Sequence, residues 1–404
     1  MHIYLKIDSI KRGFCYLVFS LFFFVAFNPD LTNNFFLWHG VQLLIVLTCF
    51  SNIRVLQMTF YTKWFFVYYS LLFLSCFWAT NPVQALTGVF YFLLIHIPLF
   101  AMYCWIHNKS DLLLCIVSFI TGLVINCFYI LNTAGLFSQI GVLTPGLHYW
   151  ASNATSRRYA LGCILIGAMI KLAKGRIEKL LYILMMIPCA YVLLFCTSRG
   201  AFLIVALSIF VAILFSKENQ FKKIGLFLLL VGLIVFLYYF IMNNQYIYPL
   251  FGRKLEKFFN AAAQKGVLGA EEDRVERIID GFKVFLNRPL FGYGYNGFAN
   301  NTRFTAYSHN DYIETLCDIG LVGFFIYYSI FHFIARFMPP AVKKEKTGGY
   351  SLIFGIVVAL FAFNVLSVVR YDISIQACLC FACVIAEQNW SSEHYGEEDG
   401  KDVN

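Results

Sequence analysis

The sequence predicts an all-α polytopic membrane protein with about twelve transmembrane helices. Of its 404 residues, 60% are hydrophobic and only 13% are charged, whereas a soluble domain is typically about 45–50% apolar and about 25% charged. Apolar runs of about 17–25 residues, which is long enough to cross a bilayer, recur along the chain. Lysine and arginine are concentrated in alternate connections between these runs. Lipid must therefore solvate most of the surface of this protein.

Twelve apolar runs are predicted to be membrane spans. They cover residues 13–29, 35–52, 62–80, 86–106, 112–132, 159–173, 180–197, 201–216, 224–242, 319–337, 350–369 and 372–387. The first run comes after Lys6, Lys11 and Arg12, but no small-residue cleavage site follows it. We therefore expect it to remain in the protein as a helix and not to be removed as a signal peptide.

The positions of the basic residues test this span count. Connections on one side of the predicted bundle share an excess of lysine and arginine: Arg54, Lys63, Lys109, Lys171, Lys174, Arg176, Lys179, Lys217, Lys222, Lys223, Arg336, Lys343, Lys344 and Lys346. The short connections on the other side, at residues 30–34, 80–84, 197–200 and 370–371, contain no lysine. Because cytoplasmic loops carry the excess of lysine and arginine, we expect both termini to be cytoplasmic.

Two outer segments are long, residues 131–158 and residues 243–318, and only the second is long enough to form a small domain. The sequence thus divides into nine helices in residues 1–242, an outer helical loop domain in residues 243–318 and three helices in residues 319–390. The polar, acidic end, residues 391–404, is expected to be a disordered cytoplasmic tail.

Composition disfavours several other classes of protein. The 13 cysteines are scattered mostly through apolar runs, as small buried residues would be. Their closest cluster, Cys378, Cys380 and Cys383, has no histidine beside it, so we expect it to pack inside a helix and not to bind a metal. No basic block with interleaved aromatic residues indicates nucleic-acid binding, although the net charge is +9. No P-loop or dinucleotide-binding pattern occurs either, and we expect neither a metal nor a cofactor.

Four arginines at the outer ends of spans are candidate binding residues. Arg199 lies between the seventh and eighth spans, Arg157 and Arg158 precede the sixth, and Arg370 lies between the last two. A charge at the edge of an apolar span is costly and suggests a function. Guanidinium groups match phosphate oxygens bidentately, which favours an anion site. The alternative is that each arginine pairs with a lipid phosphate or with a carboxylate such as Asp372.

The outer loop contains a predicted helix over residues 271–287. Apolar side chains recur along it at helical spacing: Val275, Ile278, Ile279, Phe282, Phe285 and Leu286. Acidic residues at its start suit the helix dipole, and Arg274 and Arg277 flank the apolar stripe. One interpretation is an interfacial helix with a solvated face. The other is that Arg274 turns inward to the same anion as Arg199.

A histidine stands at the outer mouth of the tenth span. Ser308 followed by Asp311 predicts a capping box that opens a helix, which places His309 in the first turn with Glu314 close by. A turn-rich connector, residues 287–297, comes before it. A lone histidine is usually structural, but this one lies near acids on the side where the arginines gather. We therefore expect His309 to act as a base or to position a substrate.

Three motifs together resemble the O-antigen ligase and O-antigen polymerase superfamily of bacterial envelope enzymes. They are Thr197-Ser198-Arg199-Gly200-Ala201 at the opening of a span, the segment from Arg274 to Arg288-Pro289-Leu290-Phe291-Gly292-Tyr293-Gly294, and His309-Asn310-Asp311-Tyr312-Ile313-Glu314 followed by Gly320-Leu321-Val322-Gly323. Their order and the large outer loop before the tenth span fit the family. The resemblance covers about residues 150–340.

The resemblance implies a GT-C-like fold and a metal-independent glycosyltransferase in the bacterial inner membrane, with its active site on the periplasmic side. Such an enzyme takes a glycan from undecaprenyl diphosphate. A ligase attaches the glycan to the lipid A–core oligosaccharide. The donor, this acceptor and membrane lipids are thus the expected partners.

The resemblance also implies residue roles. Arg199 and Arg274 would bind the diphosphate, and Arg157 or Arg158 together with Arg370 would assist. The catalytic residues would be Arg199, which stabilises the leaving group, His309, which activates the acceptor hydroxyl, and Glu314, which supports His309.

Two other functions remain open. A polymerase of O-antigen or exopolysaccharide, from the same superfamily, would use a second carrier-linked repeat unit as the acceptor. Such polymerases commonly carry paired arginine-rich outer loops with arginine and glycine at a set spacing, and no such pair occurs here, which favours the ligase. A secondary transporter or flippase would show inverted repeats with charges at midplane, whereas the unusual charges here cluster at one face.

Overall fold

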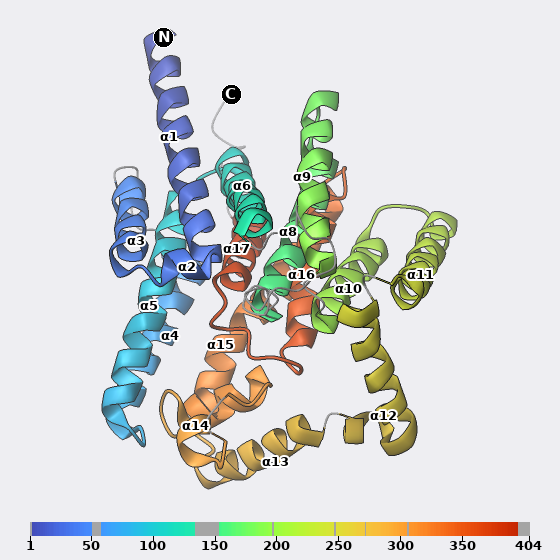
Figure 1. The fold of residues 1–404 in the computed structure, drawn as a ribbon. Helices are drawn as coiled ribbons and strands as arrows, with labels where there is room; N and C mark the ends of the chain where they lie inside the picture. Colours follow the sequence, from blue (N-terminus) through green and yellow to red (C-terminus); the bar gives the residue numbers. More distant parts are fainter. Residues whose placement is uncertain are drawn as a thin grey trace.

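The computed structural model describes residues 2–50, 58–133, 153–195, 198–245, 248–270, 272–304 and 307–394. In these ranges all regular structure is helical, which confirms the all-α prediction. Most helices form a bundle, while α12 (Arg253–Ala270), α13 (Glu272–Asn287) and α14 (Gly297–Asn301) lie at its lower end in Figure 1. These three helices belong to the predicted outer loop.

Each of the twelve predicted spans overlaps one helix of the bundle. In chain order these helices are α1 (His2–Phe27), α3 (Phe35–Phe50), α4 (Phe60–Ser75), α5 (Pro82–Trp105), α6 (Lys109–Thr133), α8 (Asn153–Leu172), α9 (Arg176–Phe195), α10 (Arg199–Phe215), α11 (Gln220–Asn243), α15 (Asp311–Lys344), α16 (Gly349–Phe363) and α17 (Ile373–His394). Shorter elements are α2 (Pro29–Thr32), the 3₁₀ turn η1 (Cys76–Trp78) and the π turn η2 (Tyr248–Gly252). Helix α17 continues past the predicted start of the tail, and residues 395–404 lie outside the described ranges.

Length and composition separate these helices into classes. Within the described residues, α1, α5, α6, α9, α11 and α15 are long and apolar enough to cross a membrane, and α3, α10, α16 and α17 are apolar but shorter. The protein is therefore an all-α membrane protein. The count of twelve spans and the GT-C-like arrangement stay predictions.

Several helices begin at side-chain caps that the sequence supplies. Asn28, Thr59, Asn81, Asn219 and Asn310 precede α2, α4, α5, α11 and α15, and each accepts a hydrogen bond from a backbone N–H of the first turn. Such a bond satisfies one of the N–H groups that have no partner within the helix. These caps fix where the bundle helices start, and hence where their outer ends lie.

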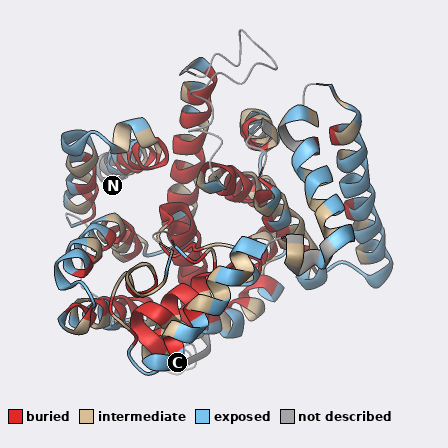
Figure 2. Cartoon of the chain, turned by 60° about the horizontal axis from the view of Figure 1, so that its bottom comes forward, coloured by how far each residue is buried: buried red, intermediate tan, exposed pale blue. Residues whose placement is uncertain are grey.

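The middle of the bundle is tightly packed. Figure 2 shows buried residues concentrated there and exposed residues around the edge. At the contact of α10 with α16, a Cβ on Gly355 would overlap the backbone oxygen of Ser208, so only glycine allows this approach. Small residues at such contacts are typical of membrane helices, because packing substitutes for the hydrophobic effect in lipid. Helix α11, in contrast, is largely exposed and apolar, as expected of a helix that faces lipid.

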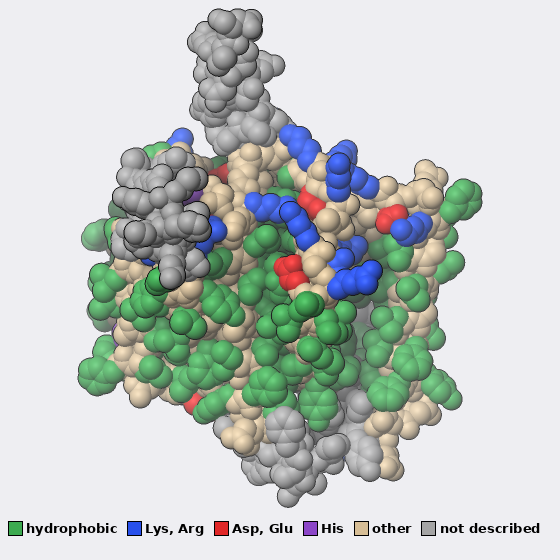
Figure 3. Space-filling model, turned by 90° about the horizontal axis from the view of Figure 1, so that it is seen from above, with side chains coloured by type: hydrophobic (Ala, Val, Ile, Leu, Met, Phe, Trp, Pro, Cys, Tyr) green, Lys and Arg blue, Asp and Glu red, His purple; other side chains and the backbone are tan. Residues whose placement is uncertain are grey.

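The basic connections that the structure describes lie together at the end of the bundle opposite α12–α14, whereas Arg54 lies outside the described residues. The ammonium group of Lys109, at the start of α6, lies 5.1 Å from the ring centre of Tyr350 at the start of α16. At the end of α15, Lys344 donates a hydrogen bond of 3.0 Å to the side chain of Asn389. Figure 3 shows lysine and arginine side chains gathered on this face. The predicted charge alternation thus corresponds to one face of the molecule, and its assignment to the cytoplasm stays a prediction.

Helix α15 is interrupted near its start. Gly320 has a φ of 62°, and the backbone N–H groups of Leu321 and Val322 donate to the carbonyls of Pro289 and Leu290 at 2.8 and 3.1 Å. The turn-rich connector after α13 therefore docks into the break. The predicted end of the loop domain, residue 318, lies beside this break, so the first two turns of α15 pack with α13 and α14.

Replacing Gly320 by alanine is expected to destabilise the fold. A Cβ there would overlap the carbonyl group of Leu290. The backbone of Gly320, with a φ of 62° and a ψ of −165°, also lies in a region that essentially only glycine adopts, and such a conformation costs other residues about 1–3 kcal/mol before any clash is counted. The melting temperature in detergent should fall clearly. The matched control is Gly225→Ala in α11, where nothing lies within 4 Å of the new Cβ. Equal melting temperatures for the two variants would contradict the proposed role of the break.

Candidate active site

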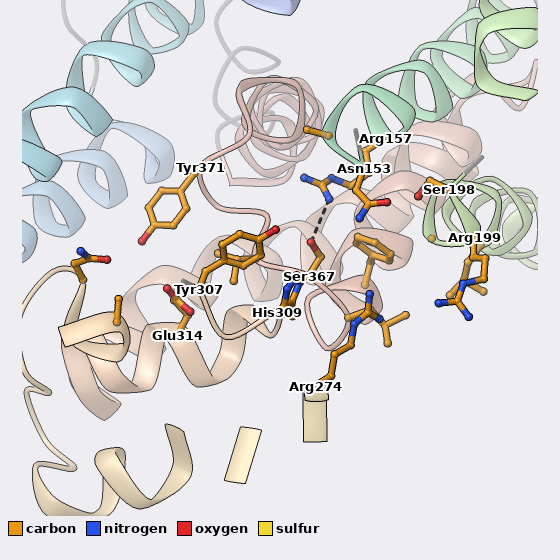
Figure 4. A pocket seen from close by; sticks show the side chains of 18 of the residues that line it. Asn153, Arg157, Ser198, Arg199, Arg274, Tyr307, His309, Glu314, Ser367 and Tyr371 are labelled. Atoms are coloured by element: carbon orange, nitrogen blue, oxygen red, sulfur yellow. Dashed lines mark hydrogen bonds between the residues drawn. The ribbon is translucent and has the colours of Figure 1, made fainter. Parts of the chain in front are cut away.

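The helix ends that face α12 and α13 enclose a cavity of about 1270 Å³. Its walls come from the starts of α5, α8, α10 and α15, from α12 and α13, from the connector before α15, and from the connection between α16 and α17. Figure 4 shows side chains from these elements pointing into one space. Most of the predicted site residues line it, namely Arg157, Arg199, Arg274, His309 and Glu314, whereas Arg158 and Arg370 do not.

One end of the cavity is basic. Arg199 is the first residue of α10, and its guanidinium carbon lies 4.6 Å from the ring centre of Phe258 in α12. Lys254 of α12 and Arg274 of α13 line the same cavity. The loop helices therefore bring two further cations to the cavity that Arg199 faces. Arg274 turns inward, as the second interpretation of its helix predicted.

Two helix N-termini add to this positive potential. Asn153 at the start of α8, and Ser198, Arg199 and Gly200 at the start of α10, line the cavity. The first backbone N–H groups of a helix have no partner within the helix, and the macrodipole places partial positive charge there. The side chain of Ser198 makes no capping hydrogen bond to this turn. Cations and helix starts together favour an anion at this end.

Asp372 orients both arginines of α8. Its Oδ2 lies 3.5 Å from a terminal nitrogen of Arg157, and its Oδ1 lies 3.7 Å from Nε of Arg158. Burial alone would raise the pKa of Asp372, but the two guanidinium groups hold it below its usual value, so the carboxylate stays ionised. The pairing that the sequence offered as an alternative is thus observed for both arginines.

Arg157 and Arg158 differ in their other hydrogen-bond partners and in whether they line the cavity. Arg157 donates a hydrogen bond of 3.1 Å to Ser367 and lines the cavity. Its Nε, which is buried, has no hydrogen-bond partner among the described residues. Arg158 instead donates to the backbone oxygen of Phe27 at 3.1 Å, away from the cavity. Between these two, only Arg157 can touch a bound molecule directly.

Arg370 differs from its prediction as a diphosphate ligand. Its side chain is buried, forms an ion pair with Asp318, and lies 3.8 Å from Oδ1 of Asp311. It also donates to Thr315 at 2.8 Å and to the Tyr371 hydroxyl at 2.6 Å. The carboxylates of α15 therefore hold its charge behind the cavity wall. What reaches the cavity is Tyr371, whose pKa is raised by burial so that the phenol stays protonated.

The predicted capping box at His309 is wrong. Asn310 caps α15 by accepting the N–H of Ile313 at 3.0 Å, and Ser308 bonds to the backbone of Asn310 instead. Asparagine caps a helix at least as well as serine, and this choice moves the helix start beyond His309. His309 itself has a φ of 61°, an uncommon left-handed conformation. Such strain is often stored at functional sites.

Glu314 completes the wall beside His309. It is 2% exposed, and Oε2 accepts the backbone N–H of Ser308 at 2.7 Å. This bond ties the segment before α15 to its first turn. The ring of His309 also lies 4.4 Å from the ring of Tyr307. An imidazole and a carboxylate that come from one segment thus share the cavity with the basic end.

A comparison with known families agrees with this geometry. Residues 184–328 match the family model described as O-antigen ligase. This part of the chain is therefore similar to the O-antigen ligase family, in agreement with the resemblance that the sequence motifs indicated. The matched segment contains Arg199, Arg274, His309 and Glu314, whereas Arg157 and Arg370 lie outside it. No curated protein matches the chain.

Sequence analysis did not predict all of the residues that line the cavity. Lining residues that it did not predict are mostly neutral: Gln84, Asn153, Tyr295, Asn296, Asn300, Tyr307, Ser367 and Tyr371, together with the cation Lys254. Most follow or precede helix ends, where polar residues are common for reasons of capping, so no periodic signal marks them. Within the described residues, no group of three or more His, Cys, Asp or Glu could hold a metal ion. The cysteines of α17 are buried in its packing, as predicted.

Proposed function

We propose that this protein is an O-antigen ligase. It transfers a glycan from undecaprenyl diphosphate to a hydroxyl of lipid A–core, at the periplasmic face of the bacterial inner membrane. The observation that carries the proposal is the shared cavity, in which Arg157, Arg199 and Arg274 lie with His309 and Glu314. Guanidinium groups, a base and a carboxylate are the groups that such a transfer requires.

The basic end suits the leaving group. As the glycosidic bond breaks, negative charge develops on the carrier diphosphate. Arg199 and Arg274 can each offer two parallel N–H donors to phosphate oxygens, and the N-termini of α8 and α10 add partial positive charge. Donors placed in advance, where charge develops, stabilise the transition state without reorganisation. This reaction scheme needs no metal ion, because the arginines supply the positive charge.

His309 and Glu314 suit the nucleophile. The acceptor hydroxyl oxygen attacks the anomeric carbon, the bond from that carbon to the diphosphate oxygen breaks, and its electron pair stays on the diphosphate. The hydroxyl proton passes to the imidazole of His309, since histidine is the side chain that most often acts as a general base. The carboxylate of Glu314 lines the same cavity and favours the imidazolium that forms. Arg158 and Arg370 act indirectly, through Asp372 and Tyr371.

Sidedness supports the periplasmic location. The lysine-rich connections lie on the face opposite the cavity, and such connections are typically cytoplasmic. The cavity would then open toward the compartment where lipid-linked glycans are transferred. The same argument disfavours a transporter, because the unusual charges gather at one face and not at midplane.

A polymerase remains the second candidate, since the matched family is compatible with both reactions. A deletion strain distinguishes them. Loss of a ligase leaves the carrier-linked polymer intact and the lipid A–core uncapped, whereas loss of a polymerase leaves a single repeat unit attached. Purified protein in detergent, mixed with lipid-linked glycan and lipid A–core, should yield a larger lipopolysaccharide band and free carrier diphosphate. If the glycan is only transported across the vesicle membrane and no carrier diphosphate is released, the proposed enzymatic function is wrong.

His309→Asn is expected to remove transfer without loss of stability. Asparagine tolerates the left-handed conformation better than histidine, but it has no base, and loss of a general base typically costs roughly 10²–10⁴-fold in rate. The melting temperature should stay equal or rise while the transfer rate falls. The matched control is His332→Asn, at an exposed position in the second half of α15. Normal O-antigen capping in cells that carry His309→Asn would remove His309 from the mechanism.

A further inference from the structure

The end of the cavity away from the arginines is lined mostly by neutral polar side chains, and binding of a diphosphate does not account for them. Its lining residues share amide or phenol groups: Gln84, Asn296, Asn300, Tyr295, Tyr307 and Tyr371. Glu314 is the only acidic or basic side chain among the described residues there, and burial raises its pKa to about 7. In the view of Figure 4, Tyr371, Tyr307 and Glu314 lie on one side of His309, and Arg157, Arg199 and Arg274 lie on the other. The cavity is therefore divided into a neutral end and a basic end.

Two tyrosines of the neutral end are held in place from behind. The rings of Tyr295 and Tyr371 have centres 5.9 Å apart at an angle of 71°. Arg370 donates to the hydroxyl of Tyr371, and the ring of Tyr295 lies against Gly88 of α5, where a Cβ would overlap it. Burial raises the pKa of Tyr295 to about 12, so this phenol also keeps its proton. Two angled, protonated phenols thus form a preorganised wall.

The amides beside them are available to a ligand. No other described residue makes a hydrogen bond to the side-chain amide of Gln84, Asn296 or Asn300, and all three line the cavity. Each amide offers two donors and one acceptor oxygen. Gln84 lies one helical turn before Gly88, so both share the face of α5 that meets Tyr295. Amides and phenols are thereby gathered around one space.

We propose that this neutral end is a subsite for an uncharged pyranose ring of the acceptor glycan. Sugar hydroxyls both donate and accept hydrogen bonds, as side-chain amides do, and the C–H face of a sugar ring packs against the negative face of an aromatic ring. No lysine or arginine among the described residues lines this end, which disfavours phosphate groups or acidic sugars there. This subsite rests on the proposed transfer function and deepens it, because it names the chemistry of the acceptor.

The placement explains how the two substrates would meet. A sugar bound between Tyr295, Tyr371 and the amides presents a hydroxyl toward His309, while a diphosphate at the basic end places the anomeric carbon on the far side of the imidazole. His309 then lies at the border of the two ends, where the proton must be taken up (Figure 4). Holding both reactants in this way lowers the entropic cost of the transfer.

Acceptor kinetics test the subsite. Gln84→Ala and Asn300→Ala each remove one amide from the cavity rim, and Gly88→Ala pushes the Tyr295 ring into the cavity while adding a better helix former to α5. Each change should raise the acceptor KM by about two- to tenfold and leave the donor KM unchanged. For the two amide changes, this range is the effect of one lost hydrogen bond. Arg274→Ala should act on the donor side instead. Arg303→Ala, an exposed arginine paired with Glu276, is the matched control.

A binding measurement separates this proposal from the transfer function. Deacylated core oligosaccharide, without any donor, is titrated into wild-type protein and into the Gln84→Ala/Asn300→Ala double variant. Binding to wild type that the double variant loses supports the subsite, even if no transfer is detected. Transfer with an unchanged acceptor KM in all three single variants overturns the subsite and leaves the transfer function standing. Failure of wild-type protein to bind the oligosaccharide also overturns it.

Discussion

Replacing Arg199 by alanine is expected to lower glycan transfer by roughly 10²–10³-fold, the usual cost of removing one group that stabilises transition-state charge. Arg199 begins α10, its side chain is exposed to the cavity, and its guanidinium packs over the Phe258 ring. The change removes a charge from the cavity but no buried core packing, so the melting temperature should change little. Transfer is measured with purified protein, and capping of lipopolysaccharide is measured in cells.

Conservative and remote variants sharpen this test. Arg199→Lys keeps the charge but loses the planar fork, so it should restore only part of the rate. Arg303→Ala, on the loop side, and Lys222→Ala, paired with Glu218 at the start of α11, should both retain activity. Near-normal capping in cells with Arg199→Ala would show that the carrier diphosphate is bound elsewhere.

Replacing Arg370 by alanine is expected to destabilise the protein by about 3–5 kcal/mol, because it leaves buried carboxylates without their partner. Arg370 is 2% exposed, and it contacts Asp311 and Asp318 of α15, Thr315 and the Tyr371 hydroxyl. These contacts connect the α16–α17 connection to α15 behind the cavity. The expected result is a large fall in melting temperature in detergent, with loss of activity as a consequence.

A double variant distinguishes charge pairing from packing. Asp318→Asn alone should also destabilise, since it weakens the compensation of a buried guanidinium. Arg370→Ala together with Asp318→Asn should cost less than the sum of the two single changes, because each loses the same interaction. Additive effects, or a melting temperature unchanged in Arg370→Ala, would contradict a buried ion pair at this place.

Arg199 and Arg370 show how far the sequence could go. Both stand between two apolar runs on the outer side, so both were predicted to bind the diphosphate. Arg199 lines the cavity, whereas Asp311 and Asp318, more than fifty positions earlier in the chain, enclose Arg370. The spacing of residues in the sequence predicts which side chains are neighbours within one helix. It does not predict which carboxylates of another helix lie next to a given arginine.

His309 shows a different limit. Two residues near it can cap a helix, Ser308 and Asn310, and the predicted pattern chose the first. The structure uses Asn310, whose side chain also donates to the backbone oxygen of Val365 at 3.1 Å. The contact with the end of α16 thus helps to decide between two caps of similar strength. As a result His309 takes a left-handed conformation that no local pattern announces.

The sequence by itself predicted the class of protein, the positions of the apolar helices, the face that carries the lysines and five residues that line the cavity, Arg157, Arg199, Arg274, His309 and Glu314. These properties follow from length, apolar runs and charge along the chain, which can be read in one dimension. Only the tertiary structure decided which arginines meet the cavity and which are neutralised behind it, and only it revealed the neutral end with its tyrosines and amides. The physical reason is that burial and pairing of polar groups depend on contacts between segments far apart in the chain.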